Sequence, residues 1–332
     1  MSGKTLAGKN ILFIAPHFFD YEIEIRRKME RLGAEVFFYD ERPSNSVFTK
    51  TMIRLNRRFL HLSIKRYFAR MMKEMKGRSV DYILVIKGET MSSSLLDEMK
   101  REFPNAQIIL YLWDSVRNNP NIKALIPLFD RALTFDPDDA REEKKLIHRP
   151  LFYLDEYAAA ASKTEYAYDA CFIGTLHSDR FAVIKKVSAA IGGKIFYYMF
   201  FHTRLLYLAH RIFDRAFKGA SIGMFRFKPL GKTDTVGAIA SSRAVIDIQH
   251  PRQKGLTMRT IEIFGAKRKL ITTNESIKQY DLYDPRNILV IDRESCVIDR
   301  AFLREPYAET DPAVYEYYSM NRWISDVFGT AK

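Results

Sequence analysis

The chain has 332 residues, of which 47% are hydrophobic and 28% charged, a balance typical of folded globular proteins. Its length is about twice that of a common domain, so two domains are expected. Two cysteines far apart in sequence, Cys171 and Cys296, provide neither a disulfide framework nor a cysteine-based zinc site, and we expect a reducing compartment. The net charge of +13 indicates an anionic partner: nucleic acid, an anionic bilayer or a phosphorylated ligand.

The N-terminal residues contain no apolar run long enough for a signal peptide before the first strand pattern begins. No stretch approaches the roughly 18 to 20 apolar residues of a membrane-spanning helix. We therefore expect a cytoplasmic protein that is neither secreted nor integral to a membrane.

Short apolar runs alternate with longer amphipathic stretches along the chain. Five runs that end at Pro, Gly or Asp read as buried strands: 10–16, 34–40, 82–88, 107–114 and 132–137. A second series with helical spacers follows at 169–174, 194–200, 244–249, 269–274 and 287–292. Strands that alternate with helices predict parallel βαβ units. The fold class is therefore α/β, with two doubly wound halves.

The alternation of strands and helices is interrupted in the segment 151–169, which is rich in small and polar residues. We therefore place the domain boundary there. The predicted domains are 1–155 and 165–311. Aromatic residues recur at helical spacing near the C-terminus, which predicts a closing helix within 312–332.

The stretch "IDIQHPRQKGLTMRTIE" has the form of a strand, a basic loop and a helix that starts at Thr257. Ligands of open parallel sheets bind beyond the carboxyl ends of strands, where helix N-termini present free N–H groups. Arg252, Lys254 and Arg259 would add positive charge for a diphosphate, and an exposed Glu262 carboxylate could accept hydrogen bonds from a ribose. Alternatively, Thr257 only caps the helix, Arg259 pairs with Glu262 and the loop is solvated.

Residues 255–274, "GLTMRTIEIFGAKRKLITTN", resemble the C-terminal domain of GT-B glycosyltransferases, particularly the CgeB-like and group 1 enzymes of bacterial surface polysaccharide synthesis. In those enzymes a G-x-x-x-R-x-x-E helix start precedes an L-I-T-T strand. "DACFIGTLHSDR" is similar to the first strand and turn of that domain, and "VIKGE" and "LYLWDS" match the N-terminal half. The resemblance implies two Rossmann-like domains that face each other across a cleft, the first binding the acceptor and the second the nucleotide-sugar.

The resemblance also implies a set of donor-binding residues. Glu262 would hold the ribose, and Arg259 would face the diphosphate. The other members are the backbone of Gly255, Leu256 and Thr257 at the diphosphate, Arg226 and Lys228 as a phosphate clamp, and Gly174 where the chain passes close to the donor. Many retaining relatives carry a second glutamate where this chain has Lys254, so retaining and inverting mechanisms both stay open.

Sugar transfer requires stabilisation of the departing diphosphate, which fixed cations and N–H groups can supply without a metal. An inverting reaction also needs a base. The candidate catalytic residues His17, Asp20 and Asp114, with Glu89 as a further candidate, each follow a predicted strand. Asp20 and Asp114 could instead be cap residues and His17 an ordinary loop histidine. Lys87, at the end of a buried strand, is expected to bind a ligand.

"FDPDDA" would allow Asp136 and Asp138 to share a divalent cation. We prefer a helix start at Pro137, with the acidic residues favoured by the helix dipole. The common metal, P-loop and dinucleotide motifs do not occur in the sequence. We expect no metal and no cofactor besides the nucleotide-sugar substrate.

The segment 50–78 carries ten Lys or Arg against one Glu, interleaved with apolar residues. One helix face could lie on an anionic membrane surface, which would make the protein peripheral on the inner membrane face. The alternative is a core-packed helix with a solvated basic back. Nucleic acid is not expected as a partner, because no recognised binding motif accompanies the charge.

The sequence thus predicts a nucleotide-sugar-dependent glycosyltransferase with a glycan or lipid-linked glycan acceptor, in capsule, exopolysaccharide or lipopolysaccharide synthesis. Two alternatives stay open. One is a nucleotide-sugar 2-epimerase, which needs no acceptor, and the other is a non-catalytic polyanion-binding protein.

Overall fold

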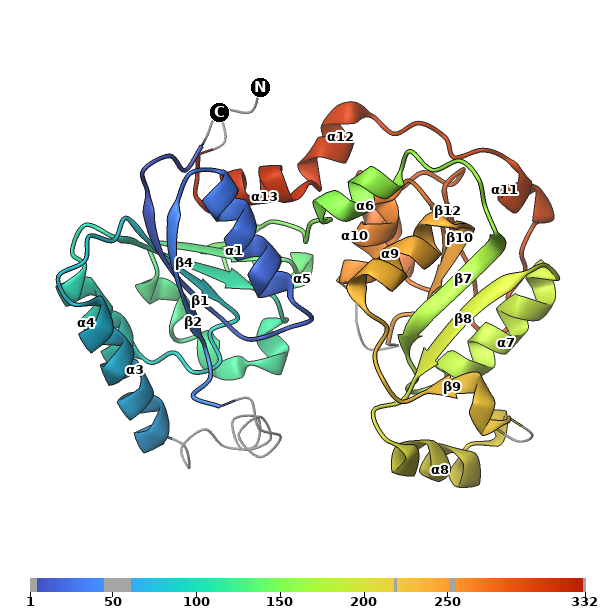
Figure 1. Cartoon of the computed structure of the whole chain (residues 1–332), viewed down its shortest axis with the longest axis horizontal. Helices are drawn as coiled ribbons and strands as arrows, with labels where there is room; N and C mark the ends of the chain where they lie inside the picture. Colours follow the sequence, from blue (N-terminus) through green and yellow to red (C-terminus); the bar gives the residue numbers. More distant parts are fainter. Residues whose placement is uncertain (1–4, 45–60, 218–219, 251–254, 331–332) are drawn as a thin grey trace. The chain divides into compact units, whose positions relative to one another are not determined.

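The computed structural model describes residues 5–44, 61–217, 220–250 and 255–330. The chain forms two compact units, Leu151–Ser319 on the one hand and Met1–Pro150 with Met320–Lys332 on the other. Each unit is built on a six-stranded sheet with helices packed on it (Figure 1). All strand pairings among the described residues are parallel, so the predicted α/β class with two doubly wound halves is confirmed.

The sheet of the first unit has the order β2-β1-β3-β4-β5-β6. Its strands are β1 (Asn10–Ala15), β2 (Glu35–Asp40), β3 (Tyr82–Ile86), β4 (Gln107–Leu112), β5 (Arg131–Thr134) and β6 (Leu146–His148). The chain leaves β1 for β2 on one side and returns to β3 on the other. The strand order therefore reverses between β1 and β3, which is where ligands bind in sheets of this kind.

The helices of the first unit are α1 (Tyr21–Arg31), α3 (His61–Met75), α4 (Ser93–Glu102), α5 (Pro137–Glu142) and α13 (Met320–Val327). In the C-terminal helix α13, Trp323 is fully buried and its ring lies 4.8 Å from that of Tyr111 in β4. The last helix of the chain is thus part of the first unit. The predicted closing segment 312–332 contains two helices, α13 and α12 (Pro312–Tyr317) in the second unit.

Helix α3 is the described part of the basic segment 50–78; residues 50–60 lie outside the described ranges. Its apolar residues pack into the core of the first unit: Ile64, Phe68, Met71, Met72 and Met75. Lys65, Arg66 and Arg70 lie on its exposed back. For this helix the structure matches the alternative, a core-packed helix with a solvated basic back, because its apolar face is buried against strands. Membrane contact of the basic segment stays a prediction.

The sheet of the second unit has the order β12-β11-β10-β7-β8-β9 and reverses between β7 and β10. Its strands are β7 (Tyr168–Thr175), β8 (Ile195–Phe200), β9 (Phe225–Arg226), β10 (Ser242–Asp247), β11 (Lys269–Thr272) and β12 (Ile288–Val290). The remaining helices are α6 (Asp155–Ala160), α7 (Arg180–Ile191), α8 (Arg204–Phe213), α9 (Lys232–Ala240), α10 (Met258–Gly265) and α11 (Arg300–Arg304).

All ten predicted strands are present, with ends shifted by up to three residues. The short strands β6 and β9 were not predicted, because three and two residues carry no readable pattern. The units divide at Pro150, so the polar segment 151–164 and helix α6 belong to the second unit. None of the described helices has the length and apolar character needed to cross a bilayer.

Candidate functional site

Arg180 stands at the carboxyl edge of the second sheet, where the strand order reverses. Its Nε donates a hydrogen bond of 2.6 Å to the carbonyl of Ile248 after β10, and Nη1 donates one of 2.7 Å to the carbonyl of Thr175 at the end of β7. Burial lowers the pKa of the guanidinium. Within the described ranges no carboxylate lies at ion-pair distance from it. A partly buried cation held only by carbonyls favours an anionic ligand.

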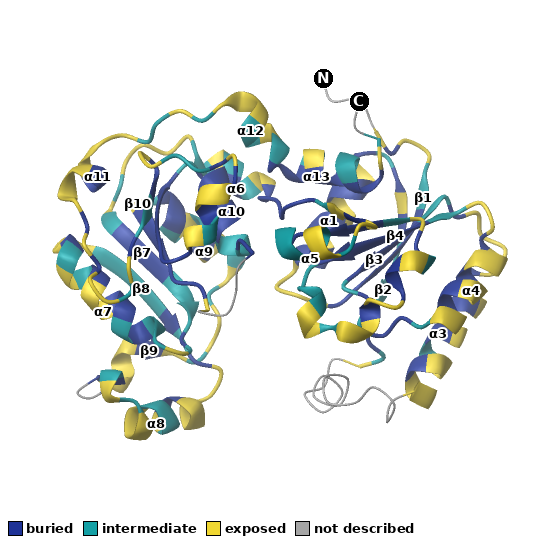
Figure 2. Cartoon of the chain, turned by 180° about the vertical axis from the view of Figure 1, so that it is seen from behind, coloured by how far each residue is buried: buried dark blue, intermediate teal, exposed yellow. Residues whose placement is uncertain are grey.

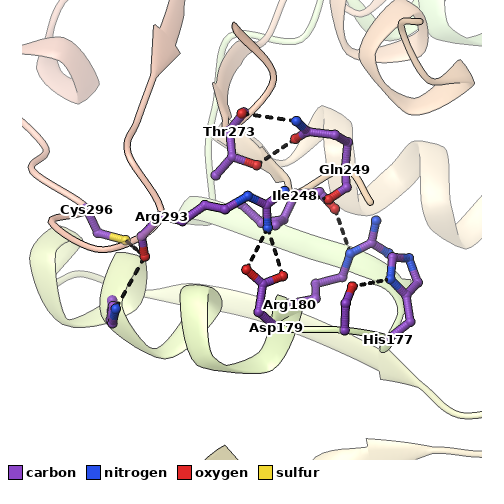
Figure 3. Close-up of polar contacts among 10 residues, drawn as sticks. His177, Asp179, Arg180, Ile248, Gln249, Thr273, Arg293 and Cys296 are labelled. Atoms are coloured by element: carbon purple, nitrogen blue, oxygen red, sulfur yellow. Dashed lines mark hydrogen bonds and ion pairs between the residues drawn. The ribbon is translucent and has the colours of Figure 1, made fainter. Parts of the chain in front are cut away.

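A second guanidinium, that of Arg293, is fixed on the same edge (Figure 3). Its Nη1 lies 2.8 Å from both carboxylate oxygens of Asp179, and its Nη2 donates to the carbonyl of Gln249 at 2.8 Å. Gln249 in turn exchanges two hydrogen bonds with Thr273, of 3.0 and 2.6 Å. Loops that follow β7, β10, β11 and β12 are thereby tied together, so both arginines are held in place before any ligand arrives.

Two histidines lie beside these arginines. The rings of His177 and His250 are 5.4 Å apart, and Nδ1 of His177 is 2.9 Å from the hydroxyl of Ser178. Burial, together with the positive charges of Arg180 and His250, lowers the pKa of His177 to about 4. Burial is the largest cause, and the two positive charges add to it.

Helix α10 begins at Met258. Arg252 and Lys254, in the loop before it, lie outside the described ranges. The Thr257 hydroxyl accepts the Thr260 N–H at 3.1 Å and donates to an oxygen of Asp247 at 2.7 Å. Thr257 is therefore the cap, as the sequence indicates. Gly255 and Leu256 are buried immediately before it, and they bring the backbone to the helix N-terminus.

Glu262 lies in the second turn of α10 and pairs with Arg259, whose Nη1 is 2.8 Å from Oε2. The sequence predicted an exposed Glu262 carboxylate, and this prediction is wrong. The residue is only 4% exposed, and its side chain faces inward, toward α6. Burial and the Glu262 carboxylate raise the pKa of Tyr157 in α6, whose hydroxyl also lies 3.5 Å from Arg259 Nη1. The pairing that the sequence left as an alternative is present, and a ribose at Glu262 would have to compete with it.

The predicted phosphate clamp lies elsewhere on the sheet. Arg226 is in the edge strand β9, and its Nη1 donates to the carbonyls of Gly223 and Phe225; Lys228 follows it and is exposed. Strands are spaced by about 4.8 Å, so β9 lies on the order of 14 Å from β10. Among the described residues, Arg180 and Arg293 are held at the carboxyl edge between β7 and β10.

Gly174 is next to last in β7. A Cβ at this position would lie 3.2 Å from the ring of Phe172 and 3.4 Å from Nη1 of Arg180. The tighter contact is with Phe172, and close approach of the chain to a donor at this glycine stays a prediction.

In the first unit, His17 follows β1 at the point where the strand order reverses. Its Nδ1 is 2.7 Å from Oε1 of the buried Glu22, and its Nε2 is 3.5 Å from Oδ2 of Asp40 at the end of β2. The imidazole is 48% exposed. A half-exposed histidine oriented by a buried carboxylate has the arrangement of a general base. Asp20 precedes α1 in a left-handed conformation, and its side chain makes no capping hydrogen bond.

Lys87 is not a lone cation. Its Nζ lies 2.9 Å from Oε1 of Glu89 and 3.0 Å from Oδ2 of Asp114, while Arg42 Nη2 lies 2.7 Å from the other Glu89 oxygen. Burial opposes the charge of Lys87, but the two carboxylates outweigh it and raise the pKa of the amine. Lys87 and Arg42 together thus neutralise Glu89 and Asp114, which makes these two carboxylates weaker base candidates than His17.

An aromatic platform on the same edge was not predicted. Its members are the exposed Phe18 and Phe19, the partly buried Trp113 and the buried Tyr21. The Trp113 ring is 6.2 Å from Phe18 and 5.6 Å from Tyr21, and Phe18 is 4.9 Å from Phe19. Phe19, which is 69% exposed, has a φ of 49°, a left-handed value that bulky residues rarely adopt. Strain of this kind collects at functional sites.

The acidic run at α5 serves the helix start. The Asp136 carboxylate accepts the Asp138 N–H at 2.9 Å, Asp138 pairs with Arg141, and Asp139 accepts the Val116 N–H at 2.7 Å. Among the described residues no three His, Cys, Asp or Glu are grouped so that they could hold a metal ion.

Comparisons with known proteins bear on the fold. No protein-family model and no curated protein matches the sequence. Sucrose-phosphate synthase from Thermosynechococcus elongatus superposes with a TM-score of 0.62 at 10% identity, over 97% of this chain and 100% of that one. HepE from Anabaena, solved with UDP and glucose, gives 0.59 at 9% identity, over 96% and 98%. UDP-GlcNAc 2-epimerase from Methanocaldococcus jannaschii gives 0.54 at 11%, over 96% and 99%.

At these identities the likeness concerns the fold and not the activity. It extends over nearly the whole of this chain and of each neighbour, and it agrees with the two parallel sheets and their strand orders. The chain therefore has the GT-B fold of two Rossmann-like domains.

Proposed function

We propose that this protein is a glycosyltransferase that moves a sugar from a nucleotide-sugar to a carbohydrate acceptor. The observation that carries the proposal is the pair Arg180 and Arg293, held at the β7–β10 edge of the second unit. The diphosphate gains negative charge as its bond to the sugar breaks, and preorganised cations stabilise that charge. The resemblance to GT-B transferases and the GT-B fold support the same assignment.

The donor's diphosphate would lie against these arginines and the backbone of 255–257 at the start of α10. Its ribose would bind Glu262. Because Glu262 is already paired with Arg259, we propose that Arg259 turns to the diphosphate when the donor binds and that ribose hydroxyls replace it at the carboxylate. The buried Glu262 carboxylate would then have a partner in both states: Arg259 before the donor binds and the ribose hydroxyls afterwards.

In the first unit we propose His17 as the base of a single-displacement, inverting reaction. The acceptor hydroxyl passes its proton to His17 as its oxygen bonds to the anomeric carbon, and the bond from that carbon to the diphosphate breaks. Glu22, at 2.7 Å, orients the imidazole and stabilises its charged form. Asp20 and Asp114 remain secondary candidates, Asp114 because it is ion-paired with Lys87.

The aromatic platform supports a carbohydrate acceptor on this unit. Sugar rings stack their apolar faces on aromatic side chains, while their hydroxyls donate to carboxylates. Phe18, Phe19 and Trp113 supply the first kind of contact, with Asp20 and Asp114 next to them in sequence. From the resemblance, we propose a glycan or lipid-linked glycan of a surface polysaccharide as the acceptor.

The fixed arginines also imply that no divalent metal is needed. They supply the charge that a metal ion provides on the diphosphate in other enzymes. We therefore expect transfer to continue in the presence of a chelator. Loss of transfer that magnesium or manganese restored would show that this part of the proposal is wrong.

The test is a transfer assay with a panel of UDP-, GDP-, dTDP- and CMP-sugars, each with and without oligosaccharide acceptors. Release of nucleotide and mass spectrometry of the glycans are followed. We expect acceptor-dependent release and a product one sugar larger. Conversion of a donor to its 2-epimer without acceptor would establish the epimerase instead, and polyanion binding without turnover of any donor would favour the non-catalytic protein.

A further inference from the structure

Helix α8 of the second unit presents an apolar face to solvent. Leu205, Leu208 and Ile212 are 77%, 47% and 73% exposed, and at positions i, i+3 and i+7 they share one side of the helix. Tyr207, on the opposite side, is 1% exposed. A helix that packs on a domain normally turns its apolar stripe inward, so these three outward residues are not explained by the core.

The helix is held firmly in this orientation. The Tyr207 ring packs on Phe225 and Phe201 at 5.0 and 5.8 Å, and its hydroxyl donates to the Ala220 carbonyl at 3.2 Å. The Thr203 hydroxyl caps the first turn by accepting the Leu206 N–H at 3.1 Å. An aromatic layer below and a cap at the start therefore fix which side faces outward.

Further exposed apolar residues lie at the end of α8 and after it. Phe213, the last residue of α8, is 85% exposed, and Ile222 and Met224 are 46% and 45% exposed. Of the thirteen exposed large hydrophobic residues in the described part of the chain, seven lie within 205–224, and Figure 2 shows α8 as largely exposed. Scattered exposed apolar residues need no explanation, but a concentration of this kind marks an interaction surface.

The charge around this surface identifies the partner. Residues 201–231 contain six Lys or Arg and a single acid, Asp214. Arg204, Arg211 and Arg215 are exposed and lie along or just after α8. A second copy of the chain, docked symmetrically here, would bring these same positive charges against each other. Anionic headgroups above an apolar layer match both the charge and the apolar residues.

We propose that α8 together with Ile222 and Met224, here called the α8 surface, binds the protein to an anionic lipid bilayer. Leu205, Leu208 and Ile212 would enter the boundary between headgroups and acyl chains, and the arginines would contact lipid phosphates. This surface is distinct from α3, whose apolar face from Ile64 to Met75 is buried. The proposal does not depend on the activity proposed above.

The experiment is co-sedimentation of the full chain with phosphatidylcholine vesicles, with and without phosphatidylglycerol, at low and high salt. The wild type should pellet with anionic vesicles at low salt. Changing Leu205, Leu208 and Ile212 together to Gln should lower the partition coefficient by about tenfold or more. Changing Arg204, Arg211 and Arg215 to Gln should lower it by about fivefold per charge at low salt and much less at high salt.

A matched control removes three positive charges from another helix. Lys65, Arg66 and Arg70 on the exposed back of α3, changed together to Gln, should leave the partition coefficient nearly unchanged. Circular dichroism and thermal unfolding check that each variant is folded. We expect the variants to fold, because the changed side chains point outward.

Three results would overturn the proposal. The first is a wild type that stays in the supernatant with anionic vesicles, and the second is a leucine and isoleucine variant that still pellets fully. The third is a loss in the α3 control as large as in the α8 variants, which would indicate non-specific attraction by net charge. If the apolar variant instead converts a dimer to a monomer on a sizing column and vesicles have no effect, the surface contacts a second copy.

Discussion

Arg259 donates a hydrogen bond of 2.8 Å to Glu262 across one turn of α10, and the two side chains differ in exposure, at 24% and 5%. The carboxylate is therefore the desolvated partner. Removing only the arginine would leave the buried carboxylate without its ion-pair partner. Removing both side chains would leave no buried charge that needs a partner. The same pair is the one that a bound ribose would have to separate.

The first prediction concerns this coupling. Arg259→Ala and Glu262→Ala should each lower the free energy of unfolding by about 1–3 kcal/mol, because each leaves a partly buried group without its partner. The double variant should cost clearly less than the sum of the two. Urea unfolding of the four proteins measures the cycle. Additive costs would show that the pair contributes little to the fold.

The second prediction concerns the diphosphate. Arg180→Ala should weaken binding of a nucleoside diphosphate by about 10- to 100-fold, since a charge-assisted contact in a partly buried site is removed. Arg243→Ala is the matched control: this arginine is exposed at the amino end of β10 and stacks on Tyr166 at 5.1 Å. Isothermal titration gives both affinities. An equal effect of the two changes would mean that Arg180 acts only through net charge.

The third prediction follows from the pKa of His177, lowered from 6.5 to about 4. Between these two values the unfolded chain binds the proton more readily than the folded one, so acidification from pH 6.5 to pH 4 favours unfolding. The loss of stability over this window should be smaller in His177→Gln than in the wild type. Thermal unfolding from pH 4 to pH 8 measures the difference, with His202→Gln as a control for the loss of an imidazole. Parallel profiles would contradict the cause assigned to the shift.

The strands were predictable because their patterns are local. Buried strands such as 10–16 and 169–174 are recognised by their β-branched and aromatic residues and by the Pro, Gly or Asp at their ends. The cap at Thr257 and the helix start at Pro137 were predictable for the same reason, since a cap is read within four residues.

The site was less predictable because its contacts are distant in sequence. Arg293 and Asp179 meet across 114 positions, and Arg180 meets Ile248 across 68; no periodicity signals such pairs. The stretch "HSDR" after the strand contains both Asp179 and Arg180, but nothing in it shows which distant residues they contact. The inward orientation of α3 was also undecidable from its sequence, because an amphipathic helix presents the same pattern to a core and to a membrane.

The fourth prediction concerns the acceptor. Trp113→Ala and Phe19→Ala should each raise the KM for a sugar acceptor by about tenfold, because stacking on an accessible aromatic ring contributes roughly 1 kcal/mol or more. The affinity for the donor nucleotide should be nearly unchanged, since these residues belong to the other unit. Initial rates over a range of acceptor concentrations give the KM. Variants that lost donor affinity instead would place the platform at the donor.

The fifth prediction is the central one, that the β7–β10 edge of the second unit binds a nucleotide-sugar. Thermal unfolding of the wild type and of Arg180→Ala, with a panel of nucleoside diphosphates and nucleotide-sugars, tests it directly, since a ligand of the folded state raises the melting temperature by mass action. We predict that at least one nucleotide-sugar stabilises the wild type and that Arg180→Ala largely abolishes the shift while Arg243→Ala retains it. A wild type that no member of the panel stabilises, or an equal shift in Arg180→Ala, would contradict the account.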